Sequence, residues 1–178
     1  RVLLDCGLFQ GLKALRARNW QAPPLDLARL DAVVLSHAPI DHSGYLPRLV
    51  RTGYTGPVYC TPATADLLHV MLPDAAHLQE EEAAFANRHG TSRHAPALPL
   101  FTVDDAARTM RQLRTADFGA SFAPGPAVEA RFTPSGHILG AGLVECRLGG
   151  RVVVFSGDLG RYDVPTMRDP DPVGAAEA

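Results

Sequence analysis

Lysine is nearly absent from this sequence of 178 residues. Lys13 is the single lysine among 17 basic residues, the others being arginine, and 19 acidic residues bring the formal net charge to -2. A chain with this balance has no overall positive field that would attract a polyanion. Any contact with nucleic acid would therefore depend on a local basic patch.

Cysteine is scarce, and its spacing shows no pairing. Cys6, Cys60 and Cys146 are far apart, odd in number and without the C-x-x-C spacing of zinc and redox motifs. This pattern excludes a disulfide-rich scaffold. It predicts a reduced, cytoplasmic protein whose thiols pack in the core.

Long apolar runs are lacking as well. The sequence contains no stretch of roughly eighteen apolar residues and no signal-peptide pattern, so it predicts neither a membrane span nor an export signal. Since it opens at Arg1 directly inside a strand-like run, we expect a fragment of a longer protein.

The residues that are present predict one α/β domain with a substantial core, because 46% of them are hydrophobic. Strands and helices alternate in the first two thirds, and short β-runs follow from Asp117 onwards. The expected strands are 2–4, 31–35, 57–60, 128–132, 143–148 and 151–155, with a Gly149-Gly150 hairpin turn, and the expected helices are 45–51, 62–71, 74–89 and 105–113.

Metal-ligand side chains gather at the ends of these predicted strands. The segment Ser36–Gly44 follows an apolar run and carries two imidazoles and a carboxylate within six residues. Imidazoles and carboxylates of this kind suit Zn²⁺ or Mn²⁺, and carboxylates that bridge would allow two ions to lie close together. The candidate set is Asp5, His37, Asp41, His42, His137 and Asp158.

Other polar side chains have simpler interpretations. Lys13, Arg16 and Arg18 lie close together in a predicted loop or short helix, where a solvated face is slightly favoured over a phosphate-binding patch. The histidines outside the candidate set are expected on the surface, namely His69, His77, His89 and His94.

Four motifs in order resemble the metallo-β-lactamase fold, and more narrowly its β-CASP branch of RNA and DNA nucleases. That branch includes RNA-processing exonucleases and cleavage-and-polyadenylation endonucleases. The segment L-L-D-C-G-L-F-Q-G around Asp5 resembles the first motif, and His37–His42 resembles the second, H-x-H-x-D-H. G-H-I-L-G at His137 resembles the third, and S-G-D at Asp158 the fourth.

The resemblance implies a set of ligands for each of two zinc ions. One ion would be held by His37, position 39, His137 and Asp158, and the other by Asp41, His42, the shared Asp158 and a histidine from a C-terminal motif that this chain lacks. Asp5 would orient these ligands without binding an ion itself. Pro39 stands where the second motif has its second histidine, so both ligand sets are incomplete and weak or partial occupancy is expected.

The same resemblance implies a fold and a domain boundary. The fold would be an αββα sandwich, present here in part and without the β-CASP domain and the C-terminal completion. Residues 1–163 would be the N-terminal part of the metallo-β-lactamase domain. Residues 164–178, rich in Pro, Asp and Ala and without periodicity, would be a linker or a truncated end.

By resemblance, the parent protein is a metal-dependent phosphodiester hydrolase of the ribonuclease type, in which hydroxide bridging two metal ions attacks phosphate. Asp41 and Asp158 would be its catalytic carboxylates. RNA or single-stranded DNA would bind through the cleft of the β-CASP domain, with a homodimer or a paired paralogue as protein partner. The fragment alone is expected to be inactive.

Two other hypotheses remain open. Pro39 is the kind of change carried by inactive paralogues that serve as binding or architectural subunits. Hydrolysis of a small ester or thioester also occurs on this fold, although the G-H-I-L-G motif speaks against it.

Overall fold

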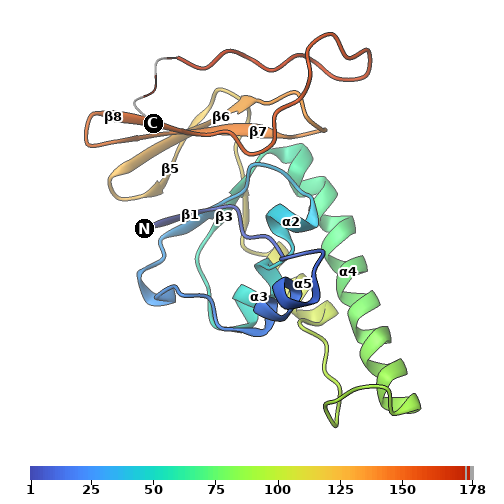
Figure 1. Ribbon diagram of the computed structural model, residues 1–178. Coiled ribbons are helices and arrows are strands. Elements are labelled where there is room, and N and C mark those ends of the chain that lie inside the picture. Colours follow the sequence, from blue (N-terminus) through green and yellow to red (C-terminus); the bar gives the residue numbers. More distant parts are fainter. Residues whose placement is uncertain (175, 177–178) are drawn as a thin grey trace.

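Two β-sheets face one another, and helices cover the outer face of one of them (Figure 1). The computed structural model describes residues 1–174 and 176. The first sheet is parallel with strand order β1-β2-β3-β4, and the second is antiparallel with order β5-β6-β7-β8. The expected α/β class with two central layers is therefore confirmed, and among the described residues helices form one outer layer.

The parallel sheet comprises β1 (Val2–Leu4), β2 (Ala32–Val34), β3 (Val58–Cys60) and β4 (Leu113–Thr115). All three residues of β2 are fully buried, because helices cover one face of this central strand and the second sheet covers the other. This burial explains why the strand is uniformly apolar. It also gives the segment that follows β2 a rigid base.

The helical layer carries the larger of two apolar cores. It is built by α3 (Leu46–Arg51), α4 (Pro62–His89) and α5 (Val103–Met110), packed on one face of the parallel sheet. Short helical turns complete the connections: α1 (Lys13–Arg16), η1 (Ala17–Trp20), η2 (Leu27–Arg29) and α2 (Ile40–Ser43). None of the helices formed by the described residues has the length and apolarity needed to cross a membrane.

The antiparallel sheet comprises β5 (Ser121–Gly125), β6 (Val128–Pro134), β7 (Gly142–Leu148) and β8 (Arg151–Phe155). Gly149 and Gly150 join the last two strands, and their φ angles of +56° and +78° suit the tight turn predicted there. A smaller core that includes Val34, Phe132 and Val144 fills the space between the sheets. The sheets therefore pack directly on each other through apolar side chains.

The expectation of two helices between residues 62 and 89 is wrong. A single helix α4 runs through Pro73. Leu68, Leu72 and Ala76 are spaced four residues apart across the proline, and all three are fully buried. Packing of this continuous stripe outweighs the roughly 3 kcal/mol that a proline costs inside a helix.

Two further boundaries differ from the predicted ones. The helix predicted at 105–113 occupies Val103–Met110, because Thr102 and Asp105 form a capping box that starts it earlier. Leu113 instead opens β4, which the sequence did not predict. Strand β5 was also missed, since Pro124 and Gly125 are turn residues; an edge strand with an irregular register tolerates them.

The three cysteines are buried free thiols, as predicted. Burial raises the pKa of the Cys60 thiol to about 12, so this side chain stays protonated at neutral pH. Residues 164–174 form no helix or strand, and the backbone N–H of Asp171 donates to the carbonyl of Pro134 at 3.0 Å. The boundary at residue 163 stays a prediction.

Candidate metal centre

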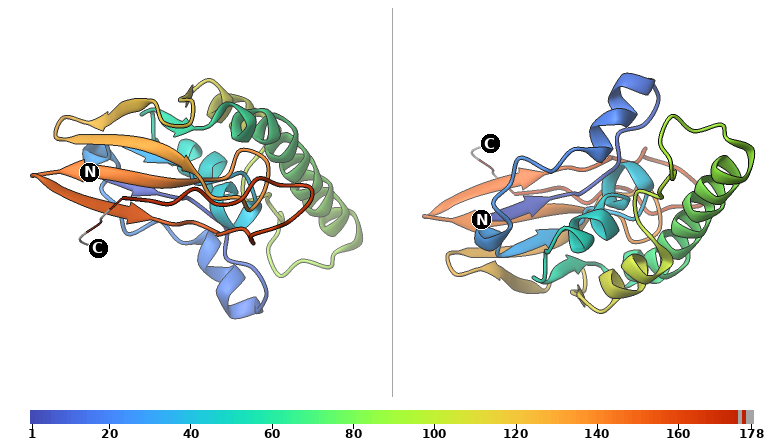
Figure 2. Two further views of the ribbon diagram at one scale, coloured as in Figure 1. Left: turned by 90° about the horizontal axis from the view of Figure 1, so that it is seen from above. Right: turned by 90° about the horizontal axis from the view of Figure 1, so that it is seen from below.

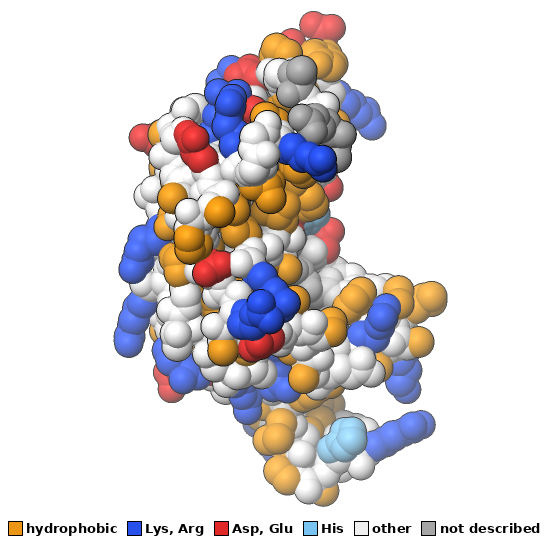
Figure 3. Space-filling model, turned by 90° about the vertical axis from the view of Figure 1, so that its left-hand side faces the viewer, with side chains coloured by type: hydrophobic (Ala, Val, Ile, Leu, Met, Phe, Trp, Pro, Cys, Tyr) orange, Lys and Arg blue, Asp and Glu red, His pale blue; other side chains and the backbone are white. Residues whose placement is uncertain are grey.

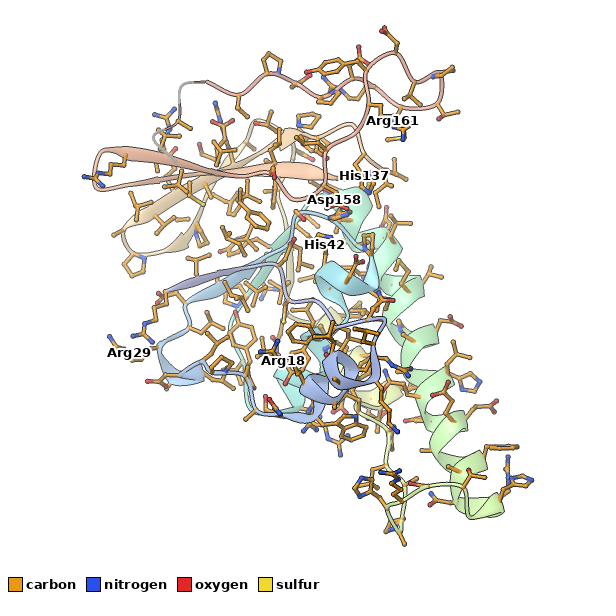
Figure 4. All side chains as sticks on the ribbon, viewed as in Figure 1. Arg18, Arg29, His42, His137, Asp158 and Arg161 are labelled. Atoms are coloured by element: carbon orange, nitrogen blue, oxygen red, sulfur yellow. The ribbon has the colours of Figure 1, made fainter. Side chains whose placement is uncertain are left out.

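The candidate ligands meet where strands of both sheets end. Asp5 follows β1, His37 follows β2, and Asp158 follows β8. The Ser36 carbonyl accepts from the Gly142 N–H at 2.9 Å, which fastens this end of the parallel sheet to β7. In Figure 4, His42, His137 and Asp158 lie together at the junction of the sheets.

Glycine permits the close approach of the two sheets at this point. Gly157, with φ of +52°, lies so near Ser36 that an added Cβ would be 2.6 Å from the serine Cβ. Gly160 likewise packs on the backbone of Gly136, and its N–H donates to the Ser135 carbonyl at 2.8 Å. These contacts hold the segments that carry His137 and Asp158 against the end of β2.

Asp5 fixes the orientation of its neighbours through hydrogen bonds. Its Oδ1 accepts from the Ser36 N–H, and its Oδ2 accepts from the Ser36 hydroxyl, both at 2.7 Å. Oδ2 also lies 2.6 Å from Nδ1 of His42. These bonds hold Asp5 at φ of +56°, a conformation that non-glycine residues seldom adopt. Both oxygens are thereby engaged, so the carboxylate acts as an orienting group, and Nε2 of His42 faces the site.

His37 presents an unpartnered ligand atom. The side chain is fully buried, and Nδ1 lies 2.9 Å from the Ser36 hydroxyl. Within the described part of the chain, Nε2 is buried without a hydrogen-bond partner. Burial, followed by the nearby His42, lowers the pKa of His37, so the ring is neutral near pH 7. A neutral imidazole with a free buried nitrogen is what a divalent metal ion requires.

Asp158 links two sets of imidazoles. Its Oδ2 lies 3.8 Å from Nε2 of His37 and 3.6 Å from Nε2 of His137. Its Oδ1 lies 3.6 Å from Nε2 of His42. Ligands bound tetrahedrally at about 2.1 Å would be about 3.4 Å apart, so these separations are close to those of a metal site. The donor atoms therefore fit the expected ions.

Asp41 lies at the open side of the same cluster. It belongs to the first turn of α2, its side chain is 56% exposed, and Oδ2 is 3.8 Å from Nε2 of His42. His42, Asp41 and Asp158 thus supply a second set of donors, next to the set of His37, His137 and Asp158. All six predicted site residues lie in this one cluster.

Pro39 occupies the N-cap of α2 and lies between His37 and Asp41 in the sequence. Its carbonyl accepts from the backbone N–H groups of His42 and Ser43, both at 2.9 Å, and its ring offers no ligand atom. The nearby hydroxyls are engaged: Ser36 donates to Asp5, and Ser43 donates to the carbonyls of Ala38 and Pro39. No compensating ligand for position 39 is present among the described residues.

The role of Ser36 is the feature that sequence reasoning missed. Its hydroxyl lies between Asp5 and His37, so it transmits the orientation of one to the other. A hydroxyl residue directly before the first motif histidine was the available signal. The remaining histidines are exposed as predicted: His69, His77, His89 and His94.

Comparisons with known proteins agree with this geometry. The beta-lactamase superfamily domain matches residues 1–173. Ribonuclease TTHA0252 of Thermus thermophilus is 38% identical over 96% of this chain, which spans 35% of that relative. Transcription termination factor FttA of Methanococcus maripaludis is 30% identical over 96% of the chain, which spans 25% of it.

A solved structure has a similar fold. A metallo-β-lactamase from Cronobacter sakazakii, a HARLDQ motif mutant, superposes with a TM-score of 0.50 at 23% identity. The match covers 92% of this chain and 54% of that one. The chain therefore spans about a third of one curated relative, a quarter of the other and about half of the solved structure.

Proposed function

This chain belongs to the beta-lactamase superfamily domain family, and from that premise we propose that it supplies the metal centre of a phosphodiester hydrolase acting on RNA. The resemblance to metallo-β-lactamase-fold nucleases of the β-CASP branch and the metallo-β-lactamase fold itself are confirmed. The fold implies a divalent metal ion. Zn²⁺, with Mn²⁺ as the alternative, is our proposal for its identity.

The position of Asp158 carries this proposal. One carboxylate oxygen faces His37 and His137 and the other faces His42, each at 3.6–3.8 Å. A carboxylate shared between two donor sets is the arrangement that places two divalent ions side by side. Such pairs suit phosphodiester cleavage, because both the attacking and the departing oxygen can be stabilised.

Each of the clustered side chains would have a separate role in metal binding. His37 and His137 would hold one ion, and His42 with Asp41 would hold the other, with Asp158 available to both. When bound, the ions supply Lewis-acid polarisation of the phosphate and neutralise the charge that develops on it. Asp5 keeps Nδ1 of His42 hydrogen-bonded, which leaves Nε2 free for the ion. Asp41 and Asp158 are the proposed catalytic carboxylates.

The names of the relatives support RNA as the substrate. One is called a ribonuclease and the other a transcription termination factor. We also propose a cytoplasmic location, which the three buried free thiols support.

Pro39 favours a second candidate function, that of a binding subunit without catalysis. The first donor set lacks the ligand that position 39 would provide, and the neighbouring hydroxyls are engaged elsewhere. A weakly held ion would leave RNA binding intact while lowering turnover.

Measuring hydrolysis by the chain and by its Pro39→His variant distinguishes a hydrolase from a binding subunit without catalysis. We expect Zn²⁺ or Mn²⁺ to give the variant measurable hydrolysis of bis(p-nitrophenyl) phosphate, whose leaving group departs without protonation, and the chain itself almost none. Hydrolysis of a thioester but of no phosphodiester would contradict the proposal and assign small-ester hydrolysis. RNA binding without any hydrolysis in either protein would assign the binding subunit.

A further inference from the structure

A groove runs beside α1, outside the metal centre. Two adjoining hollows of about 720 and 700 Å³ share Trp20 and His94 in their walls. Helix α1 stands out from the body of the molecule in both views of Figure 2, and residues 91–99 form the opposite side. We call this the basic–aromatic groove and define it by Phe9, Lys13, Arg16, Trp20, Arg93 and His94.

Cations without carboxylate partners line the groove. Lys13 and Arg16 are three residues apart and therefore share a face of α1. Among the described residues, no Asp or Glu oxygen is recorded within 4.0 Å of the charged groups of Lys13, Arg16 or Arg93, and Glu82 is the one acid in the walls. Figure 3 shows basic side chains beside hydrophobic ones at its right-hand edge and lower end. The groove therefore has a local positive charge although the chain is slightly acidic.

Exposed aromatic rings accompany these cations. Trp20 is 51% exposed and Phe9 is 46% exposed, and the guanidinium of Arg18 lies 5.0 Å from the centre of the Phe9 ring. Large rings that are half open to solvent next to unpaired cations are the combination on which single-stranded nucleic acids stack. A duplex, whose bases are already stacked, could use only the charges.

The groove is fixed rigidly to the backbone of the metal centre. Buried Asn19 pairs with Phe9 in both directions, its amide accepting from the Phe9 N–H and donating to the Phe9 carbonyl, each at 2.9 Å. Leu8 and Ile40 line the first hollow, and the Leu8 N–H donates to the Ile40 carbonyl at 3.0 Å. Ile40 directly precedes Asp41, so one wall of the groove adjoins the segment that carries proposed metal ligands.

We infer that the basic–aromatic groove binds single-stranded RNA and guides it to the metal centre. Trp20 and Phe9 receive bases, and Lys13, Arg16 and Arg93 contact phosphates. This inference rests on the proposed function for the path of the strand, but binding in the groove requires neither a metal ion nor cleavage. The two claims can therefore fail separately.

Binding of a fluorescent oligouridylate of about ten nucleotides to the full chain in EDTA tests the inference. We expect Trp20→Ala to weaken binding about tenfold, because one stacking platform is lost. Lys13→Ala with Arg16→Ala should flatten the slope of log K against log salt by about 0.7 per residue. Phe85→Ala and Arg29→Ala are matched controls: Phe85 is 52% exposed outside the groove, and Arg29 lies away from Arg18 in Figure 4.

The controls should bind like the unchanged chain. Unchanged affinity of the Trp20→Ala chain, together with an unchanged salt slope of the double variant, would overturn the inference; this is also the result expected if the groove receives a protein segment. Failure of the unchanged chain to bind the oligonucleotide would overturn it as well. Trp20-dependent binding by the chain, together with no phosphodiester hydrolysis by the Pro39→His variant, would support the inference and count against the proposed function alone.

Discussion

At the scale of single residues, two side chains, Asp5 and Ser36, orient the imidazoles of the proposed metal centre before any ion binds. Asp5 holds His42, and Ser36 lies between Asp5 and His37. Because both imidazoles use Nδ1 for these bonds, both present Nε2 to the site. The motif letters predicted which residues are involved. The serine link was not predicted, since it depends on how β1 and β2 align.

Asp5→Asn tests this orienting role. The amide group can replace only one of the two accepting oxygens, so His42 or Ser36 loses its partner. We expect Zn²⁺ affinity, measured by calorimetry, to fall about tenfold to a hundredfold while the fold is retained. Asp66→Asn, on the exposed face of α4, is the matched control and should bind as before. Unchanged affinity in the Asp5 variant would show that the hydrogen bonds of Asp5 do not matter for metal binding.

At the scale of elements, the sequence predicted the positions of several strands and helix caps, but it did not predict that one helix continues through a proline. Thr61 and Pro62 start α4 as expected, because the threonine side chain accepts from the Thr64 N–H. Gly90 ends the helix with φ of +62°. Pro73 suggested an interruption that does not exist, since packing on the sheet joins the two halves. A single proline lowers the local helix propensity, whereas the buried row of α4 side chains packed on the sheet decides whether the helix continues.

The strand pair β6–β7 contains a buried glutamate, Glu145, whose contribution to folding stability depends on pH. The pKa of Glu145 lies below its ordinary value of 4.5, chiefly because Arg131 donates to Oε2 at 2.8 Å, with Thr133 donating to Oε1 at 2.7 Å. A carboxyl group that is easier to ionise in the folded state stabilises that state above the unfolded pKa. This contribution is lost as the pH falls through the lower folded pKa.

Glu145→Gln should therefore lower the free energy of unfolding by about 1–2 kcal/mol at pH 7, a range reduced for the half-exposed arginine. Denaturant titrations of both proteins at several pH values measure the difference. We expect the gap to narrow as the pH falls below 4.5, the ordinary value for this carboxyl group. A gap that is constant from pH 7 to acid would mean that the charge of Glu145 contributes nothing.

At the scale of the whole molecule, four short motifs from strands of two sheets converge at one edge (Figures 1 and 4). Their order predicted the fold, and the six residues that they nominated for the site lie close together in the structure. It could not predict the basic–aromatic groove, because Phe9 and Trp20 belong to one segment and Arg93 and His94 to another far along the chain. Such a surface becomes visible only when α1 and residues 91–99 are placed side by side.

We propose that Asp158 joins His37 and His137 to His42 in one metal centre. The most direct test of this proposal is the Zn²⁺ affinity of the chain and of Asp158→Asn, measured side by side by calorimetry with Asp66→Asn as control. Because Asp158 belongs to both donor sets, we predict that its replacement weakens binding by at least about tenfold, with the control unchanged. Equal Zn²⁺ affinity in the chain and in the Asp158→Asn variant would contradict the account.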